Sequence, residues 1–161
     1  MHFLVGMHAR GFTLIEVLIA LGILVLAALG TAQLLSAAAI AVRDARVHAS
    51  AATAAAQRME QLLAIEWGAP GLATSPPGAL DNNVEGCVDF LDADGQLLGA
   101  GPIAPPGAAF IRRWSIDDVA GGRPNARVIR VVTRSLAADL AGARGARGEA
   151  RLVTVRARID P

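Results

Sequence analysis

The amino-acid sequence predicts an α+β fold in which one long amino-terminal α-helix packs on a small antiparallel β-sheet. Residues 12–42 are almost entirely apolar, no proline occurs before Pro70, and four carboxy-terminal segments alternate apolar with polar side chains. A long run without proline favours one continuous helix, whereas a period of two favours strands. We therefore expect a helix from about residue 12 to about residue 66, followed by a sheet domain over residues 68–161.

The first part of this helix has the length and composition of a membrane span. The apolar run from Phe12 to Val42 contains 31 residues, and Glu16 is its only charged residue. A helix needs roughly 20 apolar residues to cross a bilayer. An unpartnered carboxylate near the centre of such a helix costs about 2.5 kcal/mol or more. Residues 12–42 are therefore predicted to be a transmembrane helix in which Glu16 has a specific task.

The flanks of the run indicate its orientation and argue against an ordinary signal peptide. Arg10 precedes the span, which by the positive-inside rule places the amino terminus in the cytoplasm and residues 68–161 on the opposite side. A secretory signal has a shorter apolar core, of about 7 to 15 residues, with small residues after it. Here Gly11 comes before the run. A plain signal anchor remains the simpler alternative.

Residues 43–67 are predicted to continue the helix outside the membrane as an amphipathic segment. Arg43 and Asp44 begin a stretch that can face water, while Met59, Leu62 and Leu63 recur at helical spacing. Leu62 and Leu63 are the expected contacts with the sheet. The glycine- and proline-rich segment 68–83 is then predicted to be a loop that leads into the sheet.

Four strands are expected in the carboxy-terminal domain, at residues 86–91, 110–117, 127–135 and 151–159. In the second strand, Phe110, Trp114 and Ile116 share a face. The last strand is predicted to carry Val153, Val155 and Ile159 on one face, and Thr154, Arg156 and Arg158 on the other. Residues 137–149 are predicted to form a flexible hairpin connection.

The remaining polar residues do not form a recognisable catalytic or cofactor site. Cys87 is the only cysteine, so it can form neither an intrachain disulfide nor a thiolate metal site, and the three histidines lie outside the sheet domain. We therefore expect no enzymatic activity and no cofactor. Asp89, Asp92 and Asp94 lead into Gly95 in a pattern similar to a calcium loop. It lacks the acidic twelfth ligand of that loop, and a tight turn is the favoured interpretation.

Arginines are concentrated near the carboxy terminus. From Arg123 to Arg158 there are nine arginines against only Asp139 and Glu149. Because they alternate with apolar residues along strands, we interpret them as a solvated sheet face. The same region contains no aromatic residues for stacking on single strands. We therefore expect no nucleic-acid partner, and DNA contact is the alternative.

The residues around Gly11 resemble a known processing signal. Gly11-Phe12-Thr13-Leu14-Ile15-Glu16 is similar to the class III signal of type IV prepilins and type II secretion pseudopilins. The resemblance implies that a membrane prepilin peptidase cuts after Gly11, so that residues 1–11 are a leader peptide, and that Phe12 becomes an N-methylated amino terminus. It also implies that Glu16 pairs with the Phe12 amine of a neighbouring subunit, or with the amine of its own chain.

The sheet domain has a weaker resemblance to PilV-type minor pilins and to the I-type pseudopilin. Its basis is the sequence from residue 110 to 116 followed by that from 125 to 133. Major pilins close their carboxy-terminal region with a disulfide that Cys87 alone cannot form. The resemblance implies a minor pilin in the inner membrane, with a periplasmic sheet domain and with other pilin subunits as partners. Pseudopilin and DNA-binding receptor pilin are the alternatives.

Overall fold

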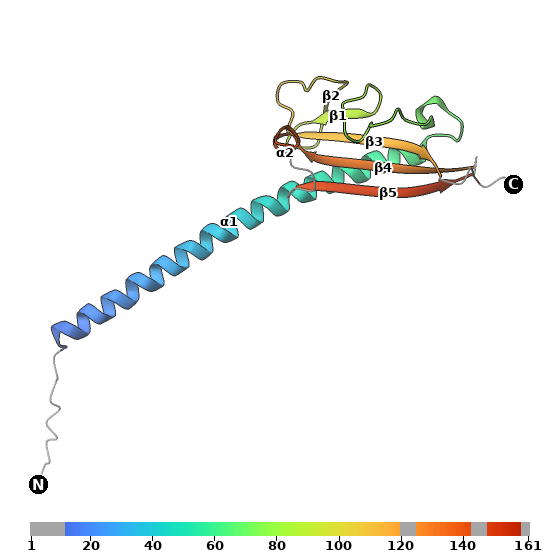
Figure 1. Ribbon diagram of the computed structural model, residues 1–161. Coiled ribbons are helices and arrows are strands. Elements are labelled where there is room, and N and C mark those ends of the chain that lie inside the picture. Colours follow the sequence, from blue (N-terminus) through green and yellow to red (C-terminus); the bar gives the residue numbers. More distant parts are fainter. Residues whose placement is uncertain (1–11, 120–124, 143–147, 159–161) are drawn as a thin grey trace, which may run out of the picture. The chain divides into compact units, whose positions relative to one another are not determined.

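The computed structural model describes residues 12–119, 125–142 and 148–158. The chain contains two compact units, Met1–Val42 and Arg43–Pro161, which we describe separately. Helix α1, Leu14–Ala64, contributes to both, and Figure 1 labels it with the other elements. These bounds confirm the predicted long helix to within two residues at each end. The predicted leader, residues 1–11, lies outside the described residues.

In the first unit, the described residues form a single helical segment with no interior. Every residue from Phe12 to Val42 is exposed, including large apolar side chains such as Leu26 and Leu34, at 70% and 71%. The helix is long and apolar enough to cross a membrane, with a mean hydropathy of 2.5 in its best window. This unit therefore presents a large apolar surface that the described part of the chain does not cover.

The second unit contains a five-stranded antiparallel sheet (Figure 1). Its strand order is β2-β1-β3-β4-β5. The strands are β1 Val88–Leu91, β2 Leu97–Ala100, β3 Phe110–Asp118, β4 Ala126–Ser135 and β5 Glu149–Ala157. All four predicted strands are confirmed, with small shifts at their ends. Strand β2 was not predicted, because its short sequence Leu-Leu-Gly-Ala has no alternating pattern.

The carboxy-terminal part of α1 packs on one face of the sheet. Its side of the core consists of small and apolar residues, Ala51, Ala54, Ala55, Met59 and Leu62. They pack with Trp114 and Ile116 of β3 and with Ile129 and Val131 of β4. The predicted shared face of Phe110, Trp114 and Ile116 is confirmed. Leu62 is buried as expected, but Leu63 is 39% exposed, so its predicted contact with the sheet is wrong.

The opposite face of the sheet is covered near β1 and β3. Val88, Phe90 and Ile111 form a second buried cluster there, against Ala108 and Leu136. Leu136 begins a short helix, α2 Leu136–Leu140, which contacts β3 and β4. The hydroxyl of Ser135 caps this helix by accepting a hydrogen bond from Ala138 N at 3.3 Å. The prediction of a flexible connection over 137–149 is therefore wrong for residues 137–140 and for Glu149, which begins β5, while residues 143–147 lie outside the described residues.

Strand β5 alternates with the predicted period over its described residues, whereas Ile159, predicted on the same face as Val153 and Val155, lies outside them. Val153 and Val155 share one face and are 57% and 62% exposed, while Thr154 and Arg156 lie on the other and are half-buried. On that second face, Leu152 packs against the core beneath α1. The segment between α1 and β1 is a loop with one 3₁₀ turn, Pro70–Leu72, and Leu72 anchors it in the core.

Candidate functional site at the head of the apolar helix

The first turn of α1 is closed by reciprocal hydrogen bonds between Thr13 and Glu16. Oε2 of Glu16 accepts from Thr13 N at 3.1 Å and from Thr13 Oγ1 at 3.0 Å. Thr13 Oγ1 in turn accepts from Glu16 N at 3.3 Å. This arrangement is a capping box, which satisfies backbone N–H groups that a helix start otherwise leaves unpaired. The spacing Thr-x-x-Glu before an apolar run is its sequence signal, which our sequence interpretation missed.

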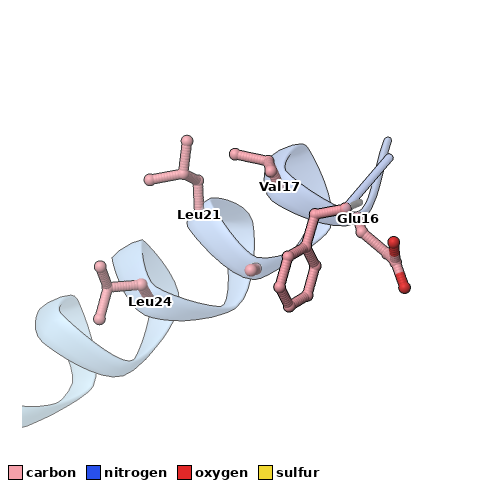
Figure 2. A pocket seen from close by; sticks show the side chains of 6 residues that line it. Glu16, Val17, Leu21 and Leu24 are labelled. Atoms are coloured by element: carbon pink, nitrogen blue, oxygen red, sulfur yellow. The ribbon is translucent and has the colours of Figure 1, made fainter. Parts of the chain in front are cut away.

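The capping box places a carboxylate at one end of an apolar surface. Phe12, Glu16, Val17, Ala20, Leu21 and Leu24 line an open hollow on the helix. Figure 2 shows the carboxylate of Glu16 pointing away from Val17, Leu21 and Leu24. Phe12, the first described residue, is 87% exposed. Oε2 of Glu16 accepts both hydrogen bonds from Thr13. The Glu16 carboxylate lies at the amino terminus of the helix, where the helix macrodipole favours negative charge.

The arrangement can accept a cation but has no catalytic constellation. A carboxylate beside exposed Phe12 and apolar side chains can bind an ammonium group while the apolar surface packs on another helix. Gly11, the predicted cleavage position, lies outside the described residues. The structure therefore brings Phe12 and Glu16 to the same surface, whereas the processing of Gly11 and Phe12 remains a prediction from the sequence.

The acidic triplet considered as a calcium loop is divided between two environments. Asp89 lies beneath α1, where its Oδ2 is 2.7 Å from Nη2 of Arg112. Asp92 closes a turn, because its Oδ1 accepts from Asp94 N at 2.9 Å and from Gln96 N at 2.8 Å. Gly95 has a φ of +82°, which favours glycine at this turn. The tight-turn interpretation is confirmed.

Arginines upstream of the arginine-rich end, which the sequence interpretation did not consider, lie between α1 and the sheet. Arg112 is 4% exposed and donates from Nη1 to the carbonyl oxygen of Ala54 at 2.9 Å, in addition to its pair with Asp89. The guanidinium of Arg58 stacks 3.7 Å above the ring of Trp114. Burial lowers the pKa of Arg58, and the nearby Asp89 opposes that effect. These charges lie between helix and sheet, where a sequence pattern alone gives no sign of them.

A second buried group lies on the opposite face of the sheet. Arg113 forms a bidentate pair with Asp139, with both distances 2.7 Å, and also donates to Asn83 Oδ1. Arg134 lies 3.2 Å from the same Asp139 carboxylate. The hydrogen bonds from Arg113 hold the pKa of Asp139 below its usual value, against the opposing effect of burial. Arg113 and Arg134 are each 6% exposed, and both are paired with Asp139. Because they are buried and paired, these two arginines are poorly placed to bind the phosphates of a nucleic acid.

Two further polar side chains stabilise the unit. Arg156 donates from Nη1 to the carbonyl oxygens of Ile65, at 2.6 Å, and Leu62, at 3.4 Å, near the end of α1. An arginine at this position satisfies carbonyl groups that the helix end leaves unpaired. The buried thiol of Cys87 donates to Ser75 Oγ at 3.5 Å. Cys87 therefore has a structural contact in the interior.

Comparison with known proteins places the recognisable feature at the amino terminus. Residues 6–32 match the family model described as the prokaryotic N-terminal methylation motif. Searches of curated proteins and of solved structures found no match to the chain. The motif match supports the type IV pilin-like family and the pilin or pseudopilin class. It points to a structural subunit, and the apolar helix supports anchorage in a membrane.

Proposed function

We propose that the protein is a minor type IV pilin, made as a single-pass inner-membrane precursor and assembled through its amino-terminal helix. Prepilin peptidase removes residues 1–11 by cutting after Gly11, and Phe12 is then N-methylated. The observation that carries this proposal is the methylation motif at the head of an apolar helix that is exposed from Phe12 to Val42. The sheet domain is placed in the periplasm, because Arg10 favours a cytoplasmic amino terminus.

The physical argument concerns what covers the apolar helix before and after assembly. In the bilayer, lipid covers it, and the bonds from Thr13 reduce the cost of keeping the Glu16 carboxylate near the apolar region. In a filament, helices of neighbouring subunits replace the lipid. Cleavage creates an amine on Phe12, which can pair with Glu16 of a neighbour so that neither charge is buried alone. Assembly therefore depends on a partner charge that the precursor lacks.

Processing is tested by replacing the glycine at the proposed cleavage site. Gly11→Val should leave the precursor at full length, whereas Gly6→Val, five residues earlier in the leader, should be cleaved normally. Mass spectrometry of the wild-type chain should give a mature protein that begins at Phe12 and carries one added methyl group. Normal cleavage of Gly11→Val would refute the assigned site.

Assembly is tested by separating the charge of Glu16 from its capping role. Glu16→Ala removes both, while Thr13→Val removes the hydroxyl bonds and keeps the carboxylate. Both chains should be inserted and cleaved, but only Glu16→Ala should be lost from sheared filaments if the carboxylate pairs with a neighbouring amine. Equal loss of the two variants would assign the effect to helix capping instead.

The alternative within the same class is a type II secretion pseudopilin. Deletion of the gene separates the two, because loss of a minor pilin reduces surface filaments, whereas loss of a pseudopilin leaves folded proteins in the periplasm. Complementation with the wild-type chain and with Glu16→Ala ties either phenotype to the helix. A secretion defect with normal pili would replace the minor pilin with the pseudopilin.

A further inference from the structure

The sheet ends in two edge strands that lie in parts of the chain with opposite charge. Within the described residues, β2 pairs only with β1, and β5 pairs only with β4. From residue 81 to residue 111, the chain that contains β1 and β2 has five carboxylates and no arginine, lysine or histidine. Among the described residues from 125 to 158, around β4 and β5, it has six arginines and two carboxylates. The strand order therefore places an acidic edge and a basic edge on opposite sides of one sheet.

The acidic edge carries exposed apolar side chains between carboxylates. Leu97 and Leu98 of β2 are 61% and 42% exposed. Exposed Asp94 lies in the turn before β2. Exposed Glu85 lies near the other end of the strand, since the neighbouring Asn83 donates to the carbonyl oxygen of Pro102, just past β2. We call β2 together with Asp94 and Glu85 the acidic edge.

The basic edge has the complementary arrangement. Val153 and Val155 of β5 are more than half exposed, and they lie between Arg151 and Arg158. The side chain of Arg151 is 57% exposed, and its contact with Glu149 is long, at 3.7 Å. We call β5 together with Arg151 and Arg158 the basic edge. Each edge therefore has an apolar centre bounded by charges, negative on one edge and positive on the other.

We propose that the acidic edge of one copy of this chain docks on the basic edge of a second copy. An edge strand presents unpaired N–H and C=O groups that can bond to another strand, and facing side chains across the new pair then contact one another. Pairing of two β5 strands would bring arginines together, and pairing of two β2 strands would bring carboxylates together. The opposite signs favour a head-to-tail contact, which repeats from subunit to subunit instead of closing into a dimer.

The occupant is a second copy because both halves of the complementary pair are present on this chain. The contact rests on the proposed function in one respect, namely that filament assembly brings sheet domains side by side. It adds a lateral contact between these domains to the contacts of the helices. The residues of both edges lie within the unit Arg43–Pro161.

The test is cross-linking of the full-length chain in membranes with introduced cysteines. In a Cys87→Ser background, one tagged chain carries Leu97→Cys and a second, differently tagged chain carries Val153→Cys. A short bismaleimide should give a mixed dimer when the two chains are co-expressed, and little dimer from either alone. Leu140→Cys, on an exposed leucine outside both edges, is the matched control for Leu97→Cys. Tryptophan fluorescence checks that every variant is folded.

Reversing the charge on each edge then tests whether electrostatic attraction between the acidic edge and the basic edge contributes to the contact. Arg151→Glu on the Val153→Cys chain should lower the yield of mixed dimer by about fivefold. Asp94→Arg on the Leu97→Cys chain should restore it, although each change alone weakens the contact. Absence of the mixed dimer in folded chains, an equal yield with Leu140→Cys, or failure of the exchange to restore the yield would overturn the proposal.

The same gel separates this proposal from the proposed function. Removal of residues 1–11 is visible as a shift in the size of each chain. A mixed dimer of uncleaved chains would leave the edge contact standing and refute pilin processing. Normal cleavage without a mixed dimer would support pilin processing and refute the edge contact.

Discussion

Replacing Asp89 with alanine is expected to destabilise the sheet domain more than any surface substitution of the same type. Asp89 is 5% exposed, and its Oδ2 lies 2.7 Å from Nη2 of Arg112 and 4.0 Å from Nε of Arg58. Without the carboxylate, Arg112 keeps its bond to the carbonyl of Ala54 but remains a buried cation beside another cation. Removing one partner of a buried pair costs about 3–5 kcal/mol, and we expect a loss in this range.

The structure provides a matched control for this effect. Asp118 is also an aspartate 4.0 Å from an arginine, Arg127, but its side chain is 70% exposed. Asp118→Ala should therefore change the free energy of unfolding by less than about 1 kcal/mol. The double variant Asp89→Leu with Arg112→Met removes both buried charges, and it should be more stable than Asp89→Ala.

The assay is denaturant unfolding of the full chain in detergent, followed by tryptophan fluorescence. Both tryptophans of the chain, Trp67 and Trp114, lie in the unit Arg43–Pro161, so the signal reports on that unit and not on the membrane helix. If the free energy of unfolding depends on denaturant concentration with the same slope in both chains, the difference between their midpoint concentrations gives the difference in stability. If Asp89→Ala unfolds within about 1 kcal/mol of the wild type, the reasoning about an unpaired buried Arg112 is wrong.

Two other predictions concern the opposite face of the sheet and the entry to β5. Arg113 lowers the pKa of Asp139 in the folded chain. The pair should therefore stabilise the fold fully at pH values above the pKa of an aspartate in the unfolded chain, about 3.9. This stabilisation should be lost as the pH falls through the lower pKa of Asp139 in the folded chain. Asp139→Asn should therefore have a lower free energy of unfolding than the wild type at pH 7. When unfolding is measured at decreasing pH, the difference in free energy between the two chains should become smaller below about pH 4. A difference that does not change with pH would contradict this. Gly148→Ala should destabilise the unit by about 1–3 kcal/mol, because φ is +88° and the new methyl would lie 2.8 Å from Cγ1 of Val47. Val47→Ala in the same chain should recover part of the loss in thermal unfolding, and no recovery would show that the backbone conformation alone is responsible.

The long helix could be predicted because its signals are local. These signals are the proline-free apolar run, the charged residues that follow it from Arg43 onward, and the methylation motif. Each lies within one continuous stretch of chain. The four predicted strands, β1, β3, β4 and β5, are also local patterns in the sequence. The capping box of Thr13 and Glu16 has a local signal too, and it could have been recognised from the sequence.

The sequence pattern gave little information on where the arginines lie. Alternation places every second residue of a strand on the same face, but it does not say whether that face is covered. Arg134 is buried because α2 supplies Asp139 next to it, and Arg112 is buried because α1 crosses that part of the sheet. Neither contact can be read from the alternation within a strand. The interpretation of a solvated face, made for the arginines from Arg123 to Arg158, was therefore wrong for Arg134.

The sequence by itself therefore determined the long helix, the length of its apolar part, the N-terminal methylation motif that contains Glu16, and the approximate positions of four strands. Only the tertiary structure decided the strand order, the short edge strand β2, and the burial of charges on both faces of the sheet. The physical reason is that hydrophobic periodicity and capping act between near neighbours in the chain. Strand pairing and ion pairing join residues far apart, such as Asp89 and Arg112, and are defined only once the chain has folded.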